Sequence, residues 1–160
     1  MIIKFTKGDL TARSKIICTR TDGSFTGASR HPGIELHDII HYAVETILEF
    51  KQGFYGILDQ GFQIEDFELP RHIRPAALIP SNLPIESIQS ELLVNQLTME
   101  VLQNPIEDFM EVFKKALEVN KLPFPDRLNE STLSKIRNLI DVIKNQWADI
   151  EEGKSMELIF

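Results

Sequence analysis

Two histidines lie four residues apart in the stretch that carries most of the chemically useful side chains, His37-Asp38-Ile39-Ile40-His41-Tyr42-Ala43-Val44-Glu45. On a helix, residues at i and i+4 lie one above the other, so His37, His41 and Glu45 would share one face. Two imidazoles paired in this way can bind one divalent cation from a single helix, and Glu45 offers an oxygen ligand beside them. The spacing therefore predicts a site for a divalent metal such as zinc.

The length of this stretch limits which of its residues can share one ion. His37 and Glu45 would lie about 12 Å apart along a helix axis, at 1.5 Å per residue, which is too far for one tetrahedral ion. Either His37 and His41 bind the metal with a ligand from elsewhere, or His41 and Glu45 do. His31 and His72 are the outside candidates, because all four histidines of the chain lie between residues 31 and 72.

Asp38 is the candidate catalytic residue, either as a base or as a group that orients an imidazole. The zinc peptidase pattern His-Glu-x-x-His has a glutamate where Asp38 stands, and the shorter side chain disfavours that activity. The His37-Asp38 doublet is similar to that of HD-type phosphohydrolases, but their further histidine and distant aspartate have no recognisable counterpart. The sequence thus favours a metal-dependent hydrolase with His37, His41, Glu45 and His72 as candidate ligands.

A structural interpretation of the same residues stays open. His41 and Glu45 would form an ordinary i, i+4 pair, and Asp38 would be favourable near the start of a helix. The protein would then be a non-catalytic module that binds a small molecule or a partner protein. Metal content and alanine substitutions at His37, His41 and Glu45 would distinguish the two interpretations.

The hydrophobic pattern predicts an α+β fold in one domain of 160 residues. Residues 1–30 read as a meander of short β-branched strands with a turn at Asp22-Gly23, and residues 155–160 alternate as a final strand that can join it. Apolar residues recur at helical spacing over 34–52, with Gly53 as the expected left-handed cap. We expect three more helices within 85–151, the second of them starting at Asn104-Pro105. The intervening segment, 53–84, is rich in proline and glycine and is expected to be irregular.

The composition limits the classes of partner that the protein is expected to bind. The net charge of −7 argues against a nucleic-acid surface, which needs clustered basic residues. No apolar run is long enough to span a membrane, and one cysteine permits no internal disulfide, so we expect a cytoplasmic protein. A small-molecule ligand fits this composition, and spare apolar area on a helix would support a homodimer.

One resemblance covers roughly the first third of the chain. The run from Asp22-Gly23 through the histidine stretch to Gly53-Phe54-Tyr55-Gly56 resembles a group of uncharacterised bacterial proteins. These share a hairpin, a His-Asp-[Leu/Ile]-x-His-Tyr-x-Val-Glu helix and a Gly-Phe-aromatic-Gly turn. The resemblance implies a domain type and a bacterial source, and it implies no particular reaction.

Overall fold

The computed structural model describes residues 1–9, 11–31 and 33–160. One antiparallel sheet has the strand order β3-β2-β1-β4. Its strands are β1 (Ile2–Thr6), β2 (Ser14–Thr19), β3 (Phe25–Arg30) and β4 (Ser155–Ile159). The predicted α+β class and the sheet built from both ends of the chain are confirmed.

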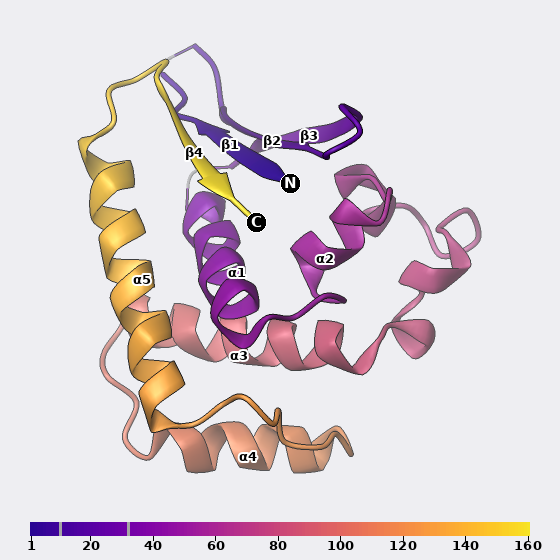
Figure 1. The fold of residues 1–160 in the computed structure, drawn as a ribbon, viewed down its shortest axis with the longest axis vertical. Coiled ribbons are helices and arrows are strands. Elements are labelled where there is room, and N and C mark those ends of the chain that lie inside the picture. Colours follow the sequence, from indigo (N-terminus) through magenta and orange to yellow (C-terminus); the bar gives the residue numbers. More distant parts are fainter. Residues whose placement is uncertain (10, 32) are drawn as a thin grey trace.

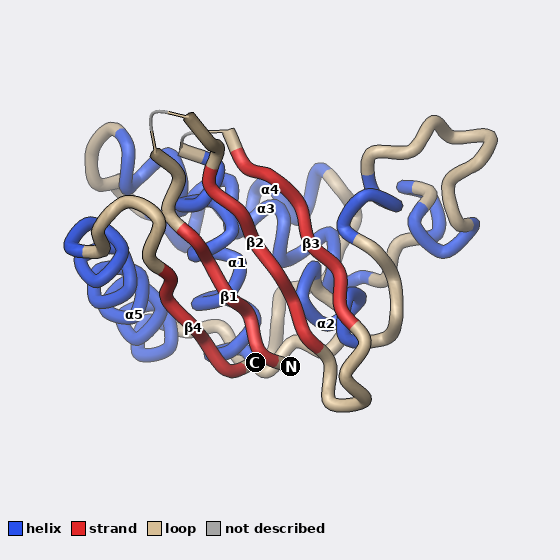
Figure 2. Tube along the Cα trace, turned by 90° about the horizontal axis from the view of Figure 1, so that it is seen from above, coloured by secondary structure: helices blue, strands red, loops and turns tan. Residues whose placement is uncertain are grey.

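Sheet register follows from the alternation of apolar residues. Ile3 pairs with Cys18 on β2, and Phe5 pairs with Ile16, and all four side chains are fully buried. Since side chains alternate between the two faces of a strand, these residues put one apolar face toward the helices. Figures 1 and 2 show every helix on that one side of the sheet, with the two chain ends side by side on β1 and β4.

The described part of the chain contains five α-helices, one more than the sequence suggests. They are α1 (Ile34–Leu48), α2 (Phe54–Asp59), α3 (Ile85–Leu102), α4 (Phe109–Val119) and α5 (Glu130–Asp149). Helix α1 runs beneath the sheet between α5 and α2, α3 crosses below it, and α4 lies farthest from the sheet (Figure 1). None of these helices has the length and apolarity needed to cross a bilayer.

The central position of α1 explains why its histidine face lies inside the molecule. Ile39 and Tyr42 pack in the cluster under the sheet, whereas Ile40 and Val44 pack in a second cluster formed with the other long helices. A helix between two apolar layers buries its flanks as well as its stripe. The polar side chains on those flanks must therefore find partners within the protein.

Three predicted boundaries are wrong. Helix α1 ends at Leu48 rather than 52, because Glu49 takes the left-handed conformation (φ 54°) and Phe50 then turns into the core. Gly53 is extended (φ −76°) and precedes α2 instead of capping α1. Helix α4 begins at Phe109 rather than Pro105, since Asp108 is left-handed (φ 52°) and interrupts the helical backbone before it.

The segment 53–84 also differs from its predicted irregular form. It contains α2 and three short 3₁₀ helices, η1 (Ile64–Phe67), η2 (Ala76–Leu78) and η3 (Pro80–Asn82). Helix α2 has no local side-chain cap, so its stabilisation comes from another part of the chain.

Candidate metal centre

The histidine pair of α1 meets a carboxylate from α3. The rings of His37 and His41 lie edge to face with centroids 4.8 Å apart, as expected for i, i+4 neighbours. Glu91 reaches both rings: its Oε2 lies 3.2 Å from His41 Nε2, and its Oε1 lies 3.8 Å from His37 Nε2. Among the described residues, these three side chains form the one group with donor atoms close enough to hold a metal ion.

The spacing of the three donors is near that of a zinc site. Ligand atoms bound at 2.0–2.1 Å to a tetrahedral ion lie roughly 3.3 Å apart. Glu91 approaches His41 at 3.2 Å through Oε2 and His37 at 3.8 Å through Oε1. With one donor atom taken from each residue, all three lie within 4.8 Å of one another. His37 is about one-third exposed, so its ring can turn to close the remaining gap. Two histidines and one carboxylate are the ligand set of catalytic zinc sites, and also of non-haem iron sites.

Glu45 lies behind His41 rather than beside the donor group. Its Oε1 accepts a 3.0 Å hydrogen bond from His41 Nδ1 and a 3.1 Å bond from Ser90 Oγ. The same carboxylate accepts the backbone N–H groups of Phe54 and Tyr55, at 2.8 and 2.9 Å, at the start of α2. Glu45 is fully buried, and its carboxylate accepts all of these hydrogen bonds. Its side chain therefore positions His41 and caps α2.

This arrangement fixes the orientation of the His41 ring. A carboxylate can only accept hydrogen bonds, so Nδ1 carries the proton toward Glu45 and Nε2 is directed at Glu91. Metal-binding histidines typically have such a carboxylate behind the ring, where it sets the tautomer and makes the ligand more basic. Glu45 thus has the role that the sequence assigns to Asp38.

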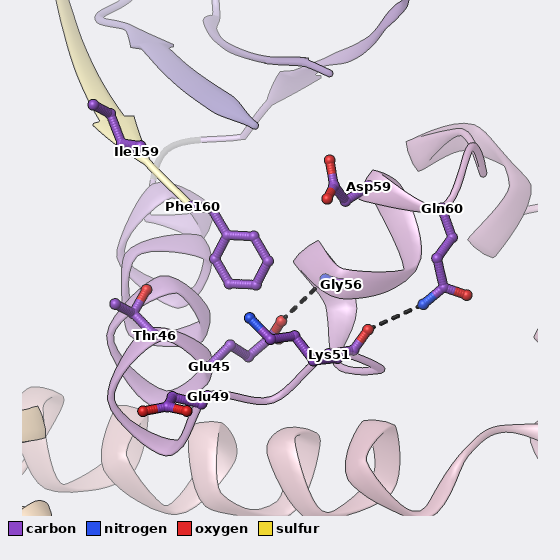
Figure 3. A pocket seen from close by; sticks show the side chains of 9 residues that line it. All are labelled: Glu45, Thr46, Glu49, Lys51, Gly56, Asp59, Gln60, Ile159 and Phe160. Atoms are coloured by element: carbon purple, nitrogen blue, oxygen red, sulfur yellow. Dashed lines mark hydrogen bonds between the residues drawn. The ribbon is translucent and has the colours of Figure 1, made fainter. Parts of the chain in front are cut away.

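Gly53 is required for the contact between Glu45 and α2. A Cβ atom at Gly53 would lie 2.3 Å from Cδ of Glu45, and any side chain there would displace the carboxylate. Figure 3 shows Glu45 reaching from α1 toward Gly56 on α2. A Cβ at Gly56 would meet the Lys51 carbonyl oxygen at 2.3 Å. The Gly-Phe-Tyr-Gly motif therefore allows close backbone packing around a buried carboxylate.

Glu45 and Glu91 favour the charged form of His41, and the two histidines favour the charged form of Glu91. Burial lowers the pKa of His41, but its hydrogen bonds and charge interactions with Glu45 and Glu91 outweigh burial and raise the pKa to about 9. Hydrogen bonds from His37 and His41 hold the pKa of Glu91 well below its usual range. At neutral pH without metal, His41 is therefore an imidazolium between two carboxylates. A metal ion would replace the proton on Nε2.

Asp38 is engaged elsewhere. Its Oδ2 accepts a 2.7 Å hydrogen bond from Arg30 Nε, and both side chains are buried. Burial raises the pKa of Asp38, although the positive charge of Arg30 opposes that rise. The backbone carbonyl of Asp38 accepts the Tyr55 hydroxyl at 3.0 Å. Asp38 joins α1 to β3 and does not contact the ring nitrogens of the two histidines in the described hydrogen bonds.

The other two histidines lie apart from this group. His72 is exposed in a turn between η1 and η2 and belongs to no cluster of three potential ligands in the described part of the chain. His31 is exposed, with its Nε2 3.1 Å from Nη1 of Arg13. The residue that the structure brings to His37 and His41 is Glu91, and neither His31 nor His72 joins them. Nothing local distinguishes Glu91 from Glu86 and Glu100 on the same helix, because only the packing of α3 against α1 selects it.

An apolar cavity borders the donor group. It has a volume of about 440 Å³ and includes His41 and Glu91 in its wall. A smaller hollow of about 280 Å³ shares these two residues and adds His37, Arg30 and Asp38. A third cavity, of about 380 Å³, is lined by residues of α1 and α2 and by Ile159 and Phe160 at the end of the chain (Figure 3). An ion held by the group would thus be accessible to a ligand.

Comparison of the chain with family models, curated proteins and solved structures gives no match.

Proposed function

We propose that the protein binds one divalent transition metal ion, with zinc the best fit, through His37, His41 and Glu91. The observation that carries the proposal is the orientation of His41, whose Nδ1 donates to buried Glu45 while Nε2 is directed at Glu91. A histidine flank that was merely solvated would need no buried carboxylate behind the ring. Such a partner is the usual support of a metal-binding imidazole.

The ligand number favours a site at which a further molecule binds. Structural zinc sites are closed by four protein ligands, whereas catalytic sites have three and leave a position for water or substrate. Three donors beside two hollows correspond to the second kind. The reaction class that this arrangement supports is hydrolysis, in which zinc lowers the pKa of a bound water to about 7.

One observation favours the alternative, a non-catalytic ligand-binding module. Both ring nitrogens of His41 have carboxylate partners without any metal, so the cluster can also join α1 to α3 by itself. In that case the cavity would bind its ligand without an ion. The first proposal requires a bound metal ion, and the alternative does not.

The test is a zinc titration of protein made without a histidine tag, followed by calorimetry and by elemental analysis after dialysis. We expect one zinc ion per chain. Glu91→Gln and His37→Ala should each weaken binding by at least about 100-fold, because each removes a direct ligand. His72→Ala is the matched control and should bind zinc as the unchanged protein does.

Two outcomes would contradict the proposed metal site. Substoichiometric zinc in the unchanged protein would exclude it, as would equal affinity in Glu91→Gln. A loss of zinc in His72→Ala and His37→Ala, with Glu91→Gln unaffected, would instead support the ligand set predicted from the sequence. Circular dichroism on each variant distinguishes lost binding from lost folding, since Glu91 is about half exposed and its replacement should leave the fold intact.

A further inference from the structure

The cavity beside the donor group is lined mainly by apolar side chains, which suit a hydrophobic molecule. Helix α2, the 3₁₀ segments and α3 contribute Phe54, Ile57, Phe67, Pro80, Leu83 and Ile88. Its volume of about 440 Å³ is about three times that of a 150 Å³ apolar cavity that holds benzene. An eight-carbon chain or a bicyclic ring therefore fits inside it.

Four polar residues line this cavity, and two of them donate hydrogen bonds to backbone carbonyls. Ser87 donates its hydroxyl to the Gln52 carbonyl, and Asn120 donates its amide to the Ala116 carbonyl at 2.8 Å. His41 and Glu91 are the remaining polar members of the wall, and both belong to the donor group. A molecule in the cavity would thus present its polar end to the ion and its apolar body to the surrounding side chains.

The charge of the site defines the polar end. A divalent ion bound by Glu91 and two neutral imidazoles would carry one net positive charge at its open position. The negative charge of Glu45 lies behind the His41 ring, where His41, Ser90 and the backbone of α2 donate hydrogen bonds to it. Arg30 and Asp38, in the adjoining hollow, neutralise each other. The matching head is therefore a single negative charge that can coordinate the metal.

We propose that the cavity and the ion together bind an amphipathic monoanion, a molecule with a metal-binding carboxylate-type head and an apolar body of about eight carbons. The inference rests on the proposed metal site and adds the class of ligand to it. The head occupies the open coordination position, and the body lies against Phe54, Leu83 and Ile88.

The experiment compares two hydroxamic acids on the zinc-loaded protein, because a hydroxamate is a monoanionic metal-binding head that can carry any chain. Each buried methylene tightens binding about fourfold. Octanohydroxamic acid should therefore bind at least about 50-fold more tightly than acetohydroxamic acid by calorimetry, even if only half of its chain is buried. Metal-free protein should bind octanohydroxamic acid far more weakly.

A cavity variant tests where the chain lies. Leu83 is partly exposed at the end of η3, so Leu83→Asp should fold and should retain zinc affinity. We expect it to reduce the preference for the longer chain at least tenfold and to leave acetohydroxamate binding unchanged. Leu102→Asp, at a 65% exposed position outside the cavity, is the matched control and should behave as the unchanged protein.

The results separate the two proposals. Stoichiometric zinc with no chain-length preference, or a preference unaffected by Leu83→Asp, overturns the inference and leaves the metal site standing. Equal binding of octanohydroxamic acid with and without zinc overturns the role of the ion in recognition. An absence of zinc binding overturns both.

Discussion

Helix α1 carries two buried clusters of charge that differ in one respect. Arg30 and Asp38 form a closed pair, with side chains only 10% and 5% exposed. The cluster of His41, Glu45 and Glu91 is buried at His41 and Glu45, but the Glu91 side chain is 53% exposed beside a cavity. A closed pair can only hold elements together, whereas an open cluster can exchange a proton for an ion. Buried charge alone therefore does not mark a functional site.

The closed pair should dominate stability. Arg30→Met leaves Asp38 buried without its partner, and the loss of one member of a buried pair costs about 3–5 kcal/mol of unfolding free energy. Urea denaturation measures this cost. Zinc affinity should change little, because neither residue is in the donor group.

Two controls sharpen this prediction. The double variant Arg30→Met with Asp38→Leu should recover most of the loss, since an apolar pair of similar volume needs no charge partner. Lys4→Met removes an exposed pair with Glu157 and should cost less than about 1 kcal/mol. If Arg30→Met costs no more than Lys4→Met, the pair is not the closed structural element described here.

The open cluster should give the metal-free protein a pH dependence above neutrality. The pKa of His41, about 9 when folded, lies above its ordinary 6.5, so its contribution is complete below pH 6.5 and is lost as pH rises to 9. The loss is on the order of 3 kcal/mol at most. Urea midpoints measured in chelator between pH 6 and 9.5 test it, and His41→Gln should flatten the profile. A wild-type profile as flat as that of the variant would contradict the assigned charges.

Gly53→Ala should affect both stability and binding, because its Cβ would displace Glu45. Overpacking at such a site costs about 1–3 kcal/mol. Loss of the support behind His41 should lower zinc affinity about 10- to 100-fold. Gly61→Ala is the control: its φ of +109° also makes alanine unfavourable, yet open space surrounds it, so zinc affinity should be unchanged. Equal zinc affinities in the two variants would remove Glu45 from the site.

Glu91→Gln should have the smallest effect on stability. Its side chain is half exposed, and removal of its charge should cost less than about 1 kcal/mol. Thermal denaturation in chelator measures that cost. The same variant should lose nearly all zinc binding. Arg30→Met and Glu91→Gln are thus opposites, the first unstable with zinc binding retained and the second stable with zinc binding lost.

Local pattern accounts for much of the fold. Alternation in β1 and β4 predicts two strands of one sheet, and the apolar spacing after Gly33 predicts α1. Helix α2 escapes prediction because its cap, Glu45, lies nine residues before Phe54 on another helix. A six-residue helix with a non-local cap leaves no local signal in the sequence.

The same limit applies to the candidate site. The i, i+4 spacing of His37 and His41 correctly indicates two rings on one face. The sequence alone cannot choose between Asp38 and Glu45 as the partner of His41, because that choice depends on what packs against each flank of α1. Glu91 lies 50 residues beyond His41 and becomes visible only when α3 crosses α1.

The most direct test of the metal site is an anomalous difference map at the zinc absorption edge, from crystals of tag-free protein loaded with zinc. We predict one strong peak at 2.0–2.2 Å from Nε2 of His37, Nε2 of His41 and a carboxylate oxygen of Glu91. Glu45 should remain hydrogen-bonded to Nδ1 of His41 in that crystal. A map without a peak at this position, or with zinc bound at Glu45 or His72 instead, would contradict it.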